Sequence, residues 1–141
     1  MAYSQTLLAD FAFYAAIVLF KVLIMAFLTT YFRRTRKVFA NPEDASLTPG
    51  GKVAIDDDVE RVRRAHLNDL ENAIPFVLIG LLYVLTADPV HSWALLHFRV
   101  FTAARILHTI VYVGQIPQPS RAMTFFAGVI VCVSMLLQII F

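Results

Sequence analysis

Hydrophobic residues in this chain gather in four long runs, which polar segments separate. The runs cover residues 11–32, 73–87, 93–113 and 122–141. A helix needs about 20 residues to cross a hydrocarbon core roughly 30 Å thick. The first, third and fourth runs are long enough, so the pattern predicts an integral membrane protein built from helices.

The second run is too short to cross a bilayer by itself. Its residues, 73–87, cover only about 22 Å at ~1.5 Å per residue. The helix must therefore take in one or two turns of the preceding polar stretch, "ERVRRAHLNDLEN", residues 60–72. Polar side chains at membrane depth usually face a bundle interior or a wet cavity and have a functional role. Pro75 is expected to kink this helix without ending it, because neighbouring helices satisfy the freed carbonyl.

We therefore expect an all-α integral membrane fold, a single domain over residues 1–141 that forms a four-transmembrane-helix bundle. The predicted spans are about residues 11–33, 62–87, 93–113 and 121–141, with a loop over residues 38–59.

Composition supports the membrane interpretation. Of 141 residues, 59% are hydrophobic and 16% are charged, whereas soluble domains have about 45–50% and 25%. Basic residues flank the loop at residues 38–59 on both sides, and Arg121 follows the third loop. The positive-inside rule places these two loops in the cytosol and both termini on the opposite side. The net charge of +2 is too small to indicate a nucleic-acid partner.

Polar side chains line particular faces of the predicted spans. At 100° per residue, Arg64, Asn68 and Glu71 share one face of the second span. In the third span, one face carries Arg105, His108 and Tyr112, with Thr109 beside it. In the cytosolic half, arginines outnumber the two carboxylates, Asp69 and Glu71, and this excess predicts a site for an anion. The arginines counted there are Arg33, Arg63, Arg64, Arg105 and Arg121.

Several of these residues also fit purely structural roles. Arg64 and Glu71 would also suit an ion pair between helices. His97 and His108 are more typical of hydrogen-bonded histidines inside a bundle than of catalytic residues. Lys21, in the middle of the first span, either pairs with a carboxylate between helices or lines a cavity.

Neither a metal site nor a nucleophilic catalytic arrangement is expected. The four histidines lack the spacing of metal ligands, and the single cysteine, Cys132, lies in an apolar span. No Ser–His–Asp arrangement or glycine-rich phosphate loop is visible.

Four segments resemble the family of membrane-associated proteins in eicosanoid and glutathione metabolism (MAPEG). They are "ERVRRAHLNDLEN", "RKVFANPEDA", "HFRVFTAARILHTIVY" and "PQPSRAMTFFAG". The resemblance implies a left-handed four-helix bundle that forms homotrimers in the endoplasmic reticulum membrane or the outer mitochondrial membrane. It also implies that the cosubstrate glutathione binds between neighbouring subunits near the cytosolic face. The second substrate would be a hydrophobic electrophile or a lipid hydroperoxide that arrives through the membrane lipid.

The resemblance also implies which residues surround glutathione. These are Arg33, Arg63, Arg64, His66, Asn68, Glu71, His108, Tyr112 and Arg121. Arg121 would be the catalytic residue, because a guanidinium beside the thiol favours the nucleophilic thiolate. Lowering a thiol pKa by about two units from ~8.5 requires roughly 2.7 kcal/mol.

Two branches of the family differ just after this arginine. The prostaglandin E synthases carry a serine and, one helical turn on, a tyrosine, where this chain has Ala122 and Phe125 as in the glutathione transferases. Asp44, which is also implicated in the isomerase, is present. A glutathione transferase with peroxidase activity is the main hypothesis, and a glutathione-dependent prostaglandin E synthase is the alternative.

Two non-enzymatic hypotheses are disfavoured by the same residues. A protein that only presents lipid does not need an anion site made of Arg64, Tyr112 and Arg121. A small cation exporter is also disfavoured, because the excess of arginine beside Glu71 repels cations.

Overall fold

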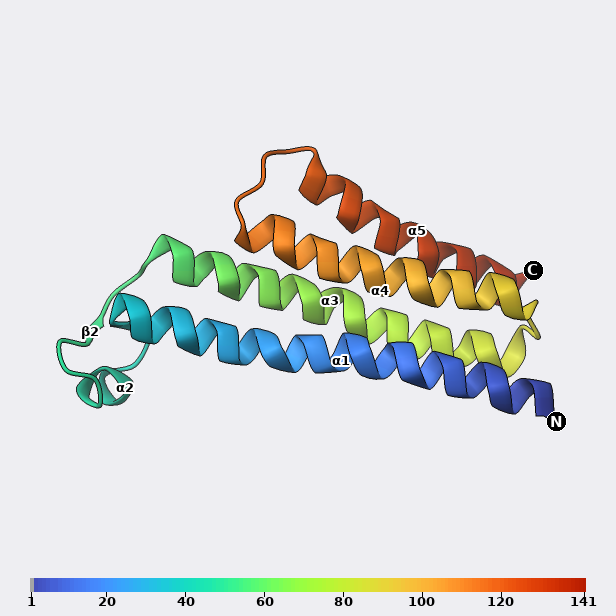
Figure 1. Cartoon of the computed structure of the whole chain (residues 1–141), viewed down its shortest axis with the longest axis horizontal. Helices are drawn as coiled ribbons and strands as arrows, with labels where there is room; N and C mark the ends of the chain where they lie inside the picture. Colours follow the sequence, from blue (N-terminus) through green and yellow to red (C-terminus); the bar gives the residue numbers. More distant parts are fainter. Residues whose placement is uncertain (1) are drawn as a thin grey trace.

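The computed structural model describes residues 2–141, and within them four long helices pack lengthwise into a bundle (Figure 1). These helices are α1 (Ala2–Arg36), α3 (Asp57–Thr86), α4 (His91–Val113) and α5 (Ser120–Ile140). Each of the four is long and apolar enough to cross a membrane. The prediction of four helical spans is confirmed, although α1 is longer at both ends than the expected residues 11–33.

The connections divide between the two ends of the bundle. Both termini and the turn from α3 to α4 lie at one end, and the α1–α3 and α4–α5 connections lie at the other (Figure 1). α1 packs mainly along α3, and α4 packs along α5, while α3 also contacts α5. This arrangement matches the expectation that the two loops bordered by basic residues share one side and the termini share the other.

Helix α3 joins the polar stretch to the short apolar run without a break. Its N-cap residue, Asp56, accepts hydrogen bonds from the backbone N–H groups of Asp58 (3.0 Å) and Val59 (3.2 Å). This cap satisfies two of the donors that every helix start leaves free. The helix then runs through Pro75 to Thr86. The polar residues in its first half therefore share one helix with the apolar run, as the length argument predicted.

The α1–α3 connection contains short elements that the sequence did not predict. Strand β1 (Val38–Phe39) pairs in parallel with β2 (Lys52–Val53), and α2 (Pro42–Ser46) lies between them. Gly51 is required in this connection, because a Cβ there would lie 2.4 Å from the carbonyl oxygen of Ala45. Elements of two and five residues are too short to leave a periodic hydrophobic pattern.

Aromatic side chains fill the centre of the bundle. Phe76 of α3 stacks on Phe101 of α4 with ring centroids 3.8 Å apart, and both side chains are fully buried. Phe11 of α1 meets Phe98 of α4 edge-on at 5.3 Å. At Gly80 on α3, an added Cβ would lie 2.3 Å from Cε2 of Phe11, so glycine permits the close approach of α1 and α3. This packing holds the polar residues of the next section at fixed depths.

Candidate functional site

An ion cluster lies buried between three helices. The Asp69 carboxylate of α3 accepts a hydrogen bond from Nη2 of Arg105 on α4 at 2.8 Å and pairs with the ammonium of Lys21 on α1 through the same oxygen, Oδ1. The other oxygen, Oδ2, accepts a hydrogen bond from Thr109 at 3.3 Å. Asp69 and Arg105 are each only 1% exposed. Of the two roles considered for Lys21, the structure assigns pairing with a carboxylate.

Arg105 pairs with Asp69 inside the bundle, so its charge is already met by a carboxylate, whereas the excess of arginine suggested that it awaits an anion. Only its Nη2 is engaged, because Nε and Nη1 are buried without a hydrogen-bond partner among the described residues. Besides Asp69, its Nη2 donates to Oδ1 of Asn68 at 2.8 Å. The sequence pattern placed Arg105 on the same face as His108, but it could not show that Asp69 neutralises this arginine. Lys21 and Arg105 share one carboxylate, so the cluster carries a formal charge of +1.

A second polar group lies where α4 ends and α5 begins. The guanidinium of Arg121, in the first turn of α5, lies over the ring of Tyr112 at 4.7 Å from its centroid. Within residues 2–141, Arg121 forms no ion pair with a carboxylate. The ring of His108 lies 5.7 Å from that of Tyr112. The structure thus brings together three of the residues that the resemblance assigned to glutathione.

His108 is held in a definite orientation. Its Nδ1 lies 3.1 Å from Oγ1 of Thr124. The Thr124 hydroxyl also lies 3.1 Å from the backbone carbonyl oxygen of Ser120 and 3.0 Å from that of Arg121, so this residue links His108 to the first turn of α5. The side chain of His108 is 2% exposed.

Three of the predicted ligands on α3, Arg63, Arg64 and Glu71, are exposed within one chain, although polar side chains at this depth were expected to face the bundle interior. Arg63 donates to both carboxylate oxygens of Glu60, at 2.9 and 2.8 Å. Arg63, Arg64 and His66 line a depression of about 230 Å³ together with Glu60 and two leucines. Arg64 and Glu71 are exposed, and the ion pair considered between them is not formed in the described part of the chain.

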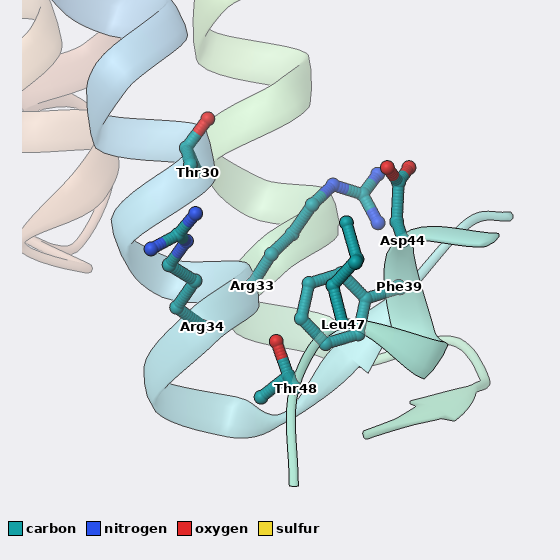
Figure 2. A pocket seen from close by; sticks show the side chains of 7 residues that line it. All are labelled: Thr30, Arg33, Arg34, Phe39, Asp44, Leu47 and Thr48. Carbon is teal, nitrogen blue, oxygen red and sulfur yellow. The ribbon is translucent and has the colours of Figure 1, made fainter. Parts of the chain in front are cut away.

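Arg33 lies apart from these groups, near the end of α1. Its guanidinium and the carboxylate of Asp44 point toward one another across a cavity of about 230 Å³ (Figure 2). Thr30, Arg34 and Thr48 add polar groups to the wall, and Phe39 and Leu47 add apolar ones. The cavity lies between α1 and α2, so it depends on the loop elements that the sequence did not predict.

The chain thus presents the predicted ligands in three places. Tyr112, Arg121 and His108 meet at α4 and α5, the ligands on α3 point outward, and Arg33 faces Asp44. Asn68 is the ligand on α3 that reaches α4, through Arg105. No three His, Cys, Asp or Glu side chains form a metal-binding group among the residues described.

A further polar network, toward the other end of the bundle, joins α3, α4 and α5. His97 lies 2.7 Å from the carbonyl oxygen of Trp93 and 2.8 Å from the hydroxyl of Ser134. The hydroxyl of Tyr83 donates to Gln138 at 2.9 Å. His97 is therefore a hydrogen-bonded histidine of the bundle, one of the roles considered for it. The partner Ser134 could not be identified from spacing, because it belongs to a different helix.

Known proteins are similar to this chain over most of its length. The model of the MAPEG family matches residues 11–141. Microsomal glutathione S-transferase 1 of Homo sapiens is 56% identical over 131 residues, which are 89% of this chain and 83% of that protein. The protein of the same name from Rattus norvegicus is 51% identical over 133 residues, which are 91% and 85% of the two chains. Prostaglandin E synthase of Homo sapiens is 39% identical over 140 residues, which are 97% and 90%.

Proposed function

The chain belongs to the MAPEG family, and from this premise we propose that it is a membrane-bound glutathione transferase. It conjugates the glutathione thiolate to hydrophobic electrophiles and reduces lipid hydroperoxides with the same cosubstrate. The identity of 51–56% to glutathione transferases, against 38–39% to prostaglandin E synthases, favours this activity over the isomerase.

The observation that carries the proposal is the state of Arg121. Its guanidinium rests on the Tyr112 ring at 4.7 Å, and no carboxylate of the described chain neutralises it. A cation held by an aromatic face keeps its charge available for an anionic ligand. Its place in the first turn of α5 adds the positive end of the helix dipole in the same sense.

The mechanism follows from thiol chemistry. Glutathione binds with its thiol beside Arg121, and the guanidinium lowers the pKa of that thiol by stabilising the thiolate. The thiolate then attacks an electrophile dissolved in the bilayer. The remaining contacts to glutathione come from Arg33, Arg63, Arg64, His66, Asn68, Glu71, His108 and Tyr112. The arginines suit the two carboxylates of glutathione, and Glu71 suits its ammonium.

The site is completed by other copies of the chain in a homotrimer. Arg64 and Glu71 are exposed on a membrane-spanning helix and have no ion-pair partner within the described chain. Charged side chains that face lipid are energetically expensive, so a neighbouring subunit and a bound ligand are expected to cover them. Chemical cross-linking in detergent, read by gel electrophoresis, should give a trimer as the limiting product, and a product that stops at dimer would contradict this.

We propose the endoplasmic reticulum membrane as the location of the enzyme and the outer mitochondrial membrane as a second location. The site faces the cytosol, because the basic residues that flank the α1–α3 and α4–α5 connections lie at the end of the bundle away from both termini (Figure 1).

The proposal is tested by measuring the conjugation of glutathione to a chlorodinitrobenzene across a range of pH. If Arg121 lowers the thiol pKa from about 8.5 to about 6.5, Arg121→Gln reduces the thiolate fraction at pH 7 about 25-fold. The pH at half-maximal rate should rise by the same two units or so, and the variant should approach the parent rate above pH 9. Arg99→Gln is the matched control, because Arg99 is an exposed arginine of α4 that bonds Tyr14 in the other half of the bundle.

Two results would overturn these claims separately. A parent protein without conjugating activity would remove the transferase. An Arg121→Gln variant with reduced activity but an unchanged pH profile would remove the thiolate role of Arg121 and leave the transferase in place.

The isomerase remains the second candidate because of one feature, the approach of Arg33 and Asp44 across their cavity (Figure 2). Conversion of prostaglandin H2 to prostaglandin E2 by the same preparation tests it. Asp44→Asn should abolish that conversion and leave conjugation intact if the isomerase activity is present.

A further inference from the structure

A single nitrogen of Arg105 holds both Asn68 and Asp69. Nη2 carries two N–H groups, and the structure directs it at Oδ1 of Asn68 and Oδ1 of Asp69, each 2.8 Å away. A guanidinium has donors only. The amide group of Asn68 must therefore present its oxygen to Arg105, which leaves its nitrogen, Nδ2, on the other side.

Arg105 is itself fixed in place. It is 1% exposed, and its partner Asp69 is anchored by Lys21 from α1 and by Thr109 from α4. Buried charge-assisted hydrogen bonds of this length are strong and directional. The side chain of Arg105 therefore has little freedom to release Asn68.

Asn68 lies at the outer edge of this cluster. Its side chain is half-buried, and Nδ2 makes no hydrogen bond to another residue of the part of the chain described. The two donors of Nδ2 are free for a ligand, whereas the amide oxygen is already engaged. A fixed amide of this kind binds a ligand acceptor and rejects a ligand donor, because a donor placed against Nδ2 would leave the N–H groups of Nδ2 unpaired.

We propose that Arg105 is a positioning residue that locks the Asn68 amide with its NH2 group toward glutathione, as a donor to a carboxylate or carbonyl oxygen of the tripeptide. This inference rests on the proposed function. Arg105 does not touch the ligand and acts through Asn68. Asp69, Lys21 and Thr109 act one step further away, because they hold Arg105.

The test measures the glutathione Kd by isothermal titration calorimetry on the purified full-length protein, with the thermal unfolding midpoint, Tm, of each variant. Asn68→Asp keeps the acceptor for Arg105 and replaces the donor group with a second acceptor. It should weaken glutathione binding by about tenfold or more, which is the effect of losing one hydrogen bond to a charged group. Its Tm should equal or exceed that of the parent, because the new carboxylate bonds Arg105 at least as strongly.

A double-variant cycle shows whether Arg105 acts through Asn68. Arg105→Lys keeps a cation for Asp69, but its shorter side chain cannot hold Asn68 as well. It should weaken binding several-fold in the parent and change it by less than twofold in the Asn68→Ala background. Ser134→Ala is the matched control, since it removes one hydrogen bond to the buried His97 toward the other end of the bundle without touching Arg105 or Asn68, and it should lower Tm but not affinity.

Each result decides the proposal. Equal effects of Arg105→Lys in both backgrounds would overturn it, as would parent-like affinity in Asn68→Asp. If Arg105→Lys does not fold, Asn68→Asp decides alone. A parent protein that does not bind glutathione would instead overturn the proposed function, and the calorimetry of the parent separates that failure from the others.

Discussion

Replacing Asp69 with asparagine tests the charge balance of the buried cluster. Lys21 and Arg105 converge on this one carboxylate, and their side chains are 14% and 2% exposed. Asp69→Asn preserves the shape of the side chain and removes its charge, so it leaves two cations side by side with no anion between them. Removing one partner of a buried ion pair typically lowers stability by about 3–5 kcal/mol. We expect a loss at the upper end of this range for Asp69→Asn, because it leaves two cations unpaired instead of one.

The control is Lys21→Met, which changes the charge in the opposite direction. It leaves the 2.8 Å pair of Arg105 and Asp69 intact and makes the cluster neutral. Because exchanging a buried ion for a well-packed apolar group is often nearly neutral, we expect a change within about 1 kcal/mol. The double variant Lys21→Met/Asp69→Asn leaves one unpaired cation rather than two, so its stability should lie between those of the single variants.

Thermal unfolding in detergent, followed by far-ultraviolet circular dichroism, measures these differences. At the unfolding entropy typical of globular chains, ~2.1 cal/mol/K per residue, a loss of about 3 kcal/mol in 141 residues lowers Tm by about 10 °C. Equal Tm values for Asp69→Asn and Lys21→Met would refute the reasoning, because they would show that the two cations do not depend on this carboxylate.

Two further predictions concern the packing of the helices. Gly80→Ala should lower Tm, because the new Cβ would lie 2.3 Å from Cε2 of the buried Phe11. We expect a loss of stability of about 1–3 kcal/mol even though alanine is the better helix former, and a raised Tm would contradict this. Phe76→Ala removes a fully buried ring that stacks at 3.8 Å on Phe101, so the same assay should show a loss of stability of about 3–5 kcal/mol. A loss below about 1 kcal/mol would mean that the ring adds little to the stability of this core.

Much of the architecture followed from the sequence alone. Spans are selected by the length and hydrophobicity of a local run, and both properties are visible in the sequence. The same arithmetic showed that residues 73–87 needed the polar turns before them, and α3 indeed runs unbroken from Asp57 to Thr86. The arginines and lysines at the ends of the spans predicted that two loops share one side and both termini the other, and Figure 1 shows this division between the two ends of the bundle.

The short elements between α1 and α3 could not be predicted. Val38 and Phe39 pair with Lys52 and Val53, fourteen residues further along the chain. Two-residue strands have no periodic pattern, and the pairing depends on how the loop folds over the end of α1. The cavity between Arg33 and Asp44 depends on that fold as well.

The candidate site, too, could be predicted from the sequence only in part. The sequence indicated an inward polar face on each of two helices, but on α3 the side chains of Arg64 and Glu71 are exposed within one chain. With the family resemblance, the sequence assigned Tyr112 and Arg121 to one ligand, and in the structure the Arg121 guanidinium lies 4.7 Å from the centroid of the Tyr112 ring. The spacing of residues along one helix determines which side chains share a face, but it does not determine which helix packs against that face. Only the packing of α1, α3 and α4 therefore decided that Lys21 and Arg105 share Asp69, that Arg105 also holds Asn68, and that Arg121 has no carboxylate partner in the described chain.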